Sequence, residues 1–159
     1  LTLLITLIMI HFKDSTDKID LNDLIHFSDI FSNKKLDAFR FFLENKIYKN
    51  QEMFVNTENM IINENLNENS YFDVNGVWLN FFHSFDSLLY FYKSIKSGHN
   101  NWIMFANSKI LPFAESGPNI LFCIGFGDDN CNKVFLVESE PTQISDTFNQ
   151  FLTEISVSI

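Results

Sequence analysis

Two pairs of apolar runs are separated by short polar segments, and each pair predicts a β-hairpin. The runs "YFDV" (71–74) and "VWLNFF" (77–82) flank Asn75-Gly76, a dipeptide that accepts the positive φ angles of a two-residue hairpin loop. The runs 120–126 and 133–138 flank the loop "GDDNCN" (127–132), so we expect them to pair as antiparallel strands. A further apolar run, "WIMFA" (102–106), predicts one more strand.

Apolar residues recur at helical spacing in four other segments, 20–31, 33–43, 84–98 and 145–155. Ser84 and Ser145 stand at the expected N-caps of the last two helices, and Gly98 is expected to end the third. The closing helix follows the i, i+3, i+4, i+7 rule with Phe148, Phe151, Leu152 and Ile155.

The stretch "LPFAESGP" (111–118) leads into the second hairpin. Pro112 restricts Leu111 to extended backbone, and Gly117-Pro118-Asn119 predicts a turn, so we interpret the stretch as a corner. Residues 56–70, rich in Asn and Glu, are predicted as a loop. The fold class that follows is α+β: a single domain with a mainly antiparallel sheet, flanking helices and a C-terminal closing helix.

The N-terminal run "LTLLITLIMI" is too short for a membrane span, which needs about twenty apolar residues. It has neither the basic region before it nor the small-residue cleavage site after it that mark a signal peptide. Two interpretations remain: a leading strand, or sequence upstream of a natural start at Met9. We expect residues 1–8 to be dispensable, and we divide the chain into an extension (1–19) and a domain (20–159).

The composition is that of a globular protein with an aromatic core. Of 159 residues, 46% are hydrophobic and 19 are Phe, a side chain with large apolar area and no polar group. The net charge is −9, and Arg40 is the only arginine. Nucleic-acid binding requires clustered Lys and Arg, so we expect no nucleic-acid ligand. The acidity has two interpretations, solubility alone or attraction of a basic protein partner.

The reactive residues form no recognised catalytic or metal-binding motif. Cys123 and Cys131 are eight positions apart without a C-x-x-C spacing, and Cys123 is expected to be a small buried residue in a reducing cytoplasm. His83 and His99 belong to no ordered triad, and the "GDD" at 127–129 is interpreted as an ordinary turn. We therefore predict no enzyme activity, no cofactor and no metal.

Four segments taken in order resemble the SUKH superfamily of Smi/Knr-type domains. They are "YFDVNGVWLNFFHSFDSLLYFYKS", "WIMFANSKILPFAESG", "ILFCIGFGDDNCNKVFLVES" and "ISDTFNQFLTEI", and the resemblance covers about residues 20–156. It implies a cytoplasmic bacterial immunity protein that binds and neutralises a cognate toxin domain, with a nuclease as the expected toxin. A regulatory adaptor or scaffold without a toxin partner, as in the fungal branch, is the alternative. The resemblance implies neither nucleic-acid nor membrane binding.

Loops held by a rigid sheet are favoured places for recognition residues, so we expect the partner to contact the loops around the two hairpins. Trp78, which follows the Asn-Gly turn, is the aromatic candidate. The acidic candidates are Asp73, Glu115, Asp128, Asp129, Glu138 and Glu140.

Overall fold

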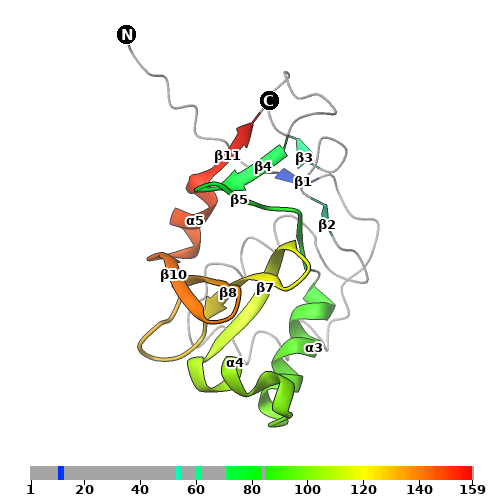
Figure 1. Ribbon diagram of the computed structural model, residues 1–159, viewed down its shortest axis with the longest axis vertical. Helices are drawn as coiled ribbons and strands as arrows, with labels where there is room; N and C mark the ends of the chain where they lie inside the picture. The colour runs from blue at the N-terminus through cyan, green and yellow to red at the C-terminus, as the bar shows by residue number, and fades with distance from the viewer. Residues whose placement is uncertain (1–10, 13–52, 55–59, 62–70, 84, 159) are drawn as a thin grey trace.

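The computed structural model describes residues 11–12, 53–54, 60–61, 71–83 and 85–158 (Figure 1). These residues have the predicted α+β content, with antiparallel sheets and three α-helices. The predictions for residues 1–10, for the helices at 20–31 and 33–43, for the Ser84 cap and for most of 56–70 lie outside the described residues. The proposed division at residues 19 and 20 also lies outside them.

The largest sheet has six antiparallel strands in the order β10-β9-β8-β7-β6-β2. Strands β8 (Ile120–Gly125) and β9 (Val134–Val137) pair antiparallel, from Leu121 opposite Val137 to Ile124 opposite Val134, which confirms the second predicted hairpin. The remaining strands are β2 (Met53–Phe54), β6 (Phe81–Phe82), β7 (Ile110–Gly117) and β10 (Pro141–Ser145). The sequence did not predict β10.

A smaller sheet contains the first hairpin, in the order β11-β4-β5. Strand β4 (Tyr71–Val74) turns into β5 (Val77–Trp78) through Asn75 and Gly76, whose φ angles of 51° and 86° are those of a two-residue loop. This hairpin is confirmed. Its third strand, β11 (Ile155–Ser158), pairs antiparallel with β4 and was not predicted. A third sheet joins β1 (His11–Phe12) to β3 (Met60–Ile61).

The predicted strand at 77–82 is interrupted, because its two halves belong to different sheets. Leu79 donates its backbone N–H to the carbonyl of Phe72 in the small sheet, at 2.9 Å. The next amide, that of Asn80, donates to the carbonyl of Glu115 on β7 of the large sheet, also at 2.9 Å. The chain therefore changes sheets between Trp78 and Phe81.

Most of the stretch 111–118 belongs to a central strand, β7, which ends at Gly117, and the prediction of a corner there was wrong. Pro112 lies inside this strand opposite Cys123, although proline cannot donate a ladder hydrogen bond. The register shifts between Pro112 and Ala114, and such an irregularity is where a sheet accepts proline. The turn that follows is confirmed: Pro118 and Asn119 form it, with Asn119 at a φ of 68°.

The prediction of a strand at 102–106 was also wrong. Asn100–Trp102 form a 3-10 helix, η2, and Ile103–Ser108 form helix α4, which ends at Lys109 in left-handed conformation. Short apolar runs do not distinguish a strand from a helix by their spacing. In this run only Phe105 is buried, which is the one-sided burial of a surface helix.

Helix α3 (Phe85–Lys96) confirms the third predicted helix, with Leu88 and Ile95 buried. The closing helix α5 (Phe148–Glu154) begins later and ends earlier than predicted. Its N-cap is Thr147, whose side chain accepts the Gln150 N–H at 3.0 Å. Ser145 is instead the last residue of β10, and its hydroxyl donates to a Glu154 carboxylate oxygen at 2.7 Å.

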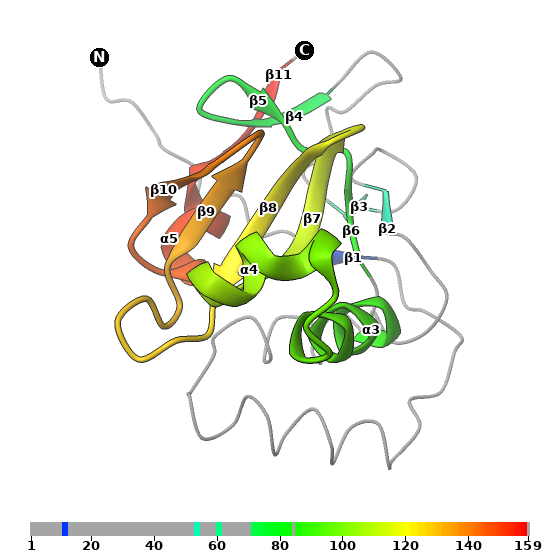
Figure 2. The same cartoon turned by 60° about the horizontal axis from the view of Figure 1, so that its bottom comes forward.

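Helices α4 and α5 lie on the two sides of the six-stranded sheet, with α4 in front of it and α5 behind it in Figure 2. Helix α5 packs against β10 and β11, and α3 and α4 pack against β7. The centre of the core is a cluster of four fully buried phenylalanines from two strands and α5: Phe113, Phe122, Phe148 and Phe151. The aromatic core that the Phe-rich composition predicts is thus present among the described residues.

Candidate functional site

The outward face of the small sheet presents a row of three side chains, one from each strand. Asp73 on β4 lies opposite Trp78 on β5 and opposite Ser156 on β11. Their neighbours Phe72, Val74 and Leu79 are buried, so the alternation of a strand directs Asp73 and Trp78 away from the core. Directly opposed residues on one face of a sheet are in side-chain contact range, with Cβ atoms about 5 Å apart.

Trp78 is the unusual member of this row, because 58% of its surface is exposed. Tryptophan is highly buried on average, and an exposed large aromatic side chain at a rigid position is a frequent energetic centre of protein interfaces. The Asn-Gly turn and the pairing with β4 fix the backbone on both sides of the indole. The structure thus presents Trp78 on a rigid strand.

The carboxylate of Asp73 is held in place by two hydrogen bonds. Its Oδ2 accepts the backbone N–H of Gly76 at 2.9 Å, and its Oδ1 accepts the Ser156 hydroxyl at 2.9 Å. The negative charge beside Trp78 is therefore preorganised.

Glu115, another predicted site residue, joins the hairpin to the large sheet. Its backbone carbonyl accepts the Asn80 N–H, and its carboxylate Oε1 lies 3.2 Å from Nε2 of His83. His83 is buried, with its ring edge-on to Phe91 at a centroid distance of 4.9 Å. Burial lowers the pKa of His83 from 6.5 to about 4, so the imidazole is neutral at pH 7 despite its carboxylate neighbour.

This buried imidazole predicts a specific pH dependence of stability. Its folded-state pKa is below its unfolded-state pKa, so the unfolded chain binds more protons between pH 4 and pH 6.5, and stability falls as the pH falls through that range. Between pH 7 and pH 5 the protein should lose about 2 kcal/mol more unfolding free energy than a His83→Gln variant does. Urea titrations at both pH values measure this difference; parallel losses in the two proteins would contradict it.

Glu138 and Glu140 lie at the same end of the large sheet as Glu115. Leu121 pairs with Glu115 on one side and with Val137 on the other, which places the exposed β9–β10 turn, with both glutamates, beside the β7–β8 turn. In Figure 2 these two turns and the β4–β5 hairpin all lie toward the top of the molecule. We call this region the acidic end, defined by Asp73, Trp78, Glu115, Glu138 and Glu140.

Asp128 and Asp129 lie at the opposite end, on the β8–β9 loop at the lower left of Figure 2. Lys109 packs close to this loop, since its carbonyl accepts the Phe126 N–H at 2.9 Å, and Lys133 directly precedes β9. The described lysines are Lys93, Lys96, Lys109 and Lys133, and none lies on the small sheet or on the β9–β10 turn. The two aspartates therefore share their end with basic residues, whereas the acidic end has no lysine among the described residues.

Sequence reasoning missed two residues that shape these loops. Ser156, which orients Asp73, is 83 positions away from it and follows the predicted closing helix, outside any predicted strand, so no local signal could join them. Asn130 braces the β8–β9 loop: its Oδ1 accepts the Gly127 N–H at 2.8 Å, and its Nδ2 donates to the Ser108 carbonyl at 2.8 Å. Its position in a Gly-Asp-Asp-Asn turn was the only sequence signal.

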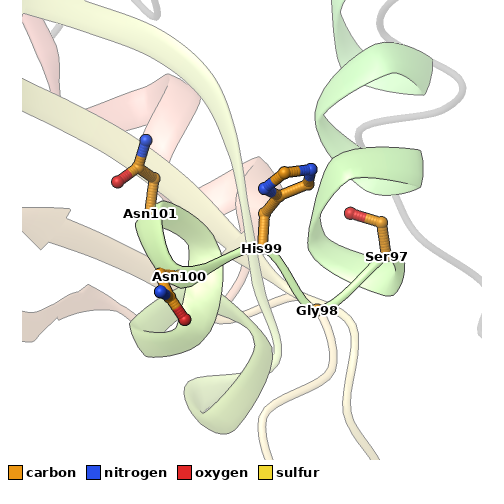
Figure 3. A pocket seen from close by; sticks show the side chains of 5 residues that line it. All are labelled: Ser97, Gly98, His99, Asn100 and Asn101. Carbon is orange, nitrogen blue, oxygen red and sulfur yellow. The ribbon is translucent and has the colours of Figure 1, made fainter.

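A small hollow lies between the end of α3 and η2 (Figure 3), with a volume of about 330 Å³. Its walls are Ser97, Gly98, His99, Asn100 and Asn101, all of them exposed. Ligand pockets are lined mainly by apolar and aromatic side chains that enclose the ligand. This hollow lacks such walls, so we do not assign it a function.

Other groups with reactive side chains are dispersed in the described part of the chain. Cys123 is buried as predicted, and burial raises the pKa of its thiol, which keeps it protonated; Cys131 is half-buried. Among the described residues, no three His, Cys, Asp or Glu side chains are close enough to hold a metal ion. None of the described helices has both the length and the apolar character that crossing a membrane requires.

Comparisons with protein-family models, with curated proteins and with solved structures gave no match to this chain. The class that the described residues define is an α+β protein with antiparallel sheets. The resemblance to the SUKH superfamily stays a prediction.

Proposed function

We propose that this protein is an immunity protein that binds a basic toxin domain, with a nuclease as the expected toxin, and blocks it through the acidic end. The observation that carries the proposal is the exposed Trp78 on a rigid hairpin beside a fixed carboxylate, at an end with no lysine among the described residues. A central aromatic residue with surrounding charges is the usual composition of an interface that recognises one partner. The choice of a toxin domain as the partner comes from the resemblance of the sequence to SUKH domains.

Charge gives this surface a physical reason to meet a nuclease. A nuclease binds the phosphate backbone through clustered Lys and Arg, so its substrate site is basic. An acidic surface on a protein of net charge −9 is attracted to that site, and such steering raises association rates by about tenfold to a thousandfold. Occupation of the site excludes the nucleic acid.

The direct test needs a candidate toxin domain, to be sought among the genes that neighbour this one. The purified toxin domain should form a stable complex with this protein and lose its activity on nucleic acid at equimolar concentration. If the toxin stays fully active when this protein is present in excess, the proposal is overturned. The adaptor interpretation would then be favoured.

A matched pair of double variants tests which end binds. Charge reversal at Glu138 and Glu140 should slow association with the toxin about threefold to tenfold and weaken its salt dependence, while dissociation changes little. The same reversal at Asp128 and Asp129 adds equal charge at the opposite end and should have the smaller effect. Stopped-flow association at two salt concentrations gives both quantities, and a larger effect at Asp128 and Asp129 would place the interface on the β8–β9 loop.

A further inference from the structure

The turn of the β4–β5 hairpin contains the one Asn-Gly dipeptide of the chain, Asn75-Gly76. In this dipeptide an asparagine side chain deamidates more readily than before a larger residue, because glycine has no side chain to hinder its own backbone nitrogen. Both residues are exposed, and no heavy atom lies within 4 Å of a Cβ added to Gly76. Water therefore reaches the turn, and the backbone geometry decides whether the reaction proceeds in the folded protein.

The reaction is a ring closure followed by hydrolysis. The Gly76 backbone nitrogen loses its proton to hydroxide and attacks Cγ of Asn75. The new C–N bond forms, the bond from Cγ to the side-chain nitrogen breaks, and ammonia leaves. Water then opens the succinimide at one of its two carbonyls and gives aspartate or isoaspartate at position 75. The net change consumes a water and releases an ammonia, so it needs no oxidant and no cofactor.

We propose that Asn75 is a deamidation site that the folded hairpin suppresses, and that the Asp73 carboxylate is the group that maintains this suppression. Oδ2 of Asp73 accepts the Gly76 N–H at 2.9 Å. The attacking nitrogen must leave that bond and lose that proton, and a carboxylate beside it disfavours the negative charge that results. Asp73 is itself held by the Ser156 hydroxyl at 2.9 Å, so the acceptor stays in position.

The conformation of Asn75 opposes ring closure independently. Its φ angle is 51°, in the left-handed region where ψ is about +30 to +60°. Such a ψ turns the Gly76 nitrogen to the side of the Cα–C bond away from Cβ, whereas the ring needs both on the same side. The necessary rotation breaks the two-residue loop and the Val74–Val77 pair that closes it. The hairpin must therefore open before the asparagine reacts.

The two products differ in their effect on the hairpin. Aspartate adds a negative charge to the turn and leaves the length of the backbone unchanged. Isoaspartate directs the backbone through the side chain and lengthens it by a methylene, so the two-residue loop no longer matches Val74 with Val77. The next bond along, from the Leu79 N–H to the Phe72 carbonyl, then loses its alignment. The effect on partner binding rests on the proposed function, whereas the modification itself does not.

The experiment follows deamidation of the full chain by peptide mapping, which separates asparagine, aspartate and isoaspartate at position 75. A synthetic peptide of residues 71–80 is the open reference. It should deamidate at least about tenfold faster than the full chain at the same pH, because the protein opens this hairpin only part of the time. Asp73→Ala should speed the reaction of the full chain about threefold to tenfold, the net effect of losing one hydrogen bond. Hydrogen exchange of the Gly76 amide should accelerate by a similar factor, since both reactions remove the same proton.

Two controls separate this local effect from changes in charge and in global stability. Asp129→Ala removes the same charge from an exposed loop at the other end and should leave the deamidation rate unchanged. The Cys123 amide lies at the centre of the large sheet, between β7 and β9, and its exchange reports global opening. Its exchange rate should be the same with and without Asp73→Ala. An equal acceleration at Cys123 and Gly76 would assign the effect to global unfolding and contradict the local role of Asp73.

Equal rates in the peptide and the full chain would overturn the suppression. An unchanged rate in Asp73→Ala, or the same acceleration in Asp129→Ala, would remove Asp73 from the account. If neither product forms in the peptide, Asn75 is not a deamidation site at all. None of these measurements needs a partner protein, so their outcome is distinguishable from failure of the proposed function.

Discussion

Replacing Phe151 by alanine should reduce the free energy of unfolding by about 3–5 kcal/mol, the range of fully buried phenylalanine truncations. Phe151 is completely buried and lies where helix α5 meets the large sheet. Its ring centroid is 5.3 Å from that of Phe113 and 5.5 Å from that of Phe122, with an edge-on geometry to Phe113. The substitution removes these contacts and leaves a cavity that rigid strands cannot close.

The matched control is Asn149→Ala, on the same helix but exposed, which should change stability by less than about 0.5 kcal/mol. Urea titration of both variants measures the difference. A loss below about 1 kcal/mol for Phe151→Ala would show that α5 is peripheral to the core.

Gly125→Ala should destabilise the protein by about 3 kcal/mol or more, although it adds only a methyl group. A Cβ at residue 125 would overlap the backbone carbonyl of Asn130 and come within 2.7 Å of the Asn130 Cγ. Asn130 is held by hydrogen bonds to Gly127, Ser108 and Lys109, so the loop has little freedom to move away. Overpacking at such a rigid site costs about 1–3 kcal/mol and sometimes more, and here the neighbour is backbone.

Gly117→Ala is the matched control for this steric argument. Gly117 ends β7 with no heavy atom within 4 Å of an added Cβ and without a left-handed φ angle. Alanine there should be neutral or stabilise by about 0.4–1 kcal/mol, because it restricts the unfolded chain. Equal thermal denaturation midpoints for the two alanine variants would refute the proposed clash.

The elements that the sequence predicted correctly depend on contacts between near neighbours. The Asn75-Gly76 turn, the β8–β9 hairpin, the Pro118–Asn119 turn and helix α3 each have a signal within a dozen or so residues of chain. Turn chemistry and apolar spacing act at that range, so the sequence alone sufficed for them.

The elements predicted wrongly depend on partners far away in the chain. The apolar run 102–106 is helical because α4 packs on β7 with one face, and spacing alone does not show which faces are covered. Residues 111–117 form a strand because β6 and β8 pair with the two edges of β7, so tertiary pairing prevails over the presence of Pro112. Ser145 was expected to cap α5, but it pairs with Val134 as the last residue of β10. Thr147 provides the cap instead.

For the candidate site, too, the sequence identified the residues, but only the structure showed which of them lie together. The sequence named Asp73, Trp78, Glu115, Glu138 and Glu140 because acids and an aromatic residue gather near predicted turns, and the structure places all five at one end. It named Asp128 and Asp129 for the same reason, and strand direction places them at the other end. Which residues lie at the same end of the sheet depends on the direction in which each strand runs. The composition of the chain does not determine that direction.

The sequence by itself determined the α+β class, the two hairpins, the phenylalanine core and the acidic balance, because hydrophobic burial, turn conformation and charge are properties of the residues themselves. Only the tertiary structure decided that residues 77–82 divide between two sheets, that His83 is buried beside Glu115, and that Ser156 holds the Asp73 carboxylate next to an exposed Trp78. These arrangements bring together residues up to 83 positions apart in the chain. Which residues meet depends on the pairing and register of the strands that carry them.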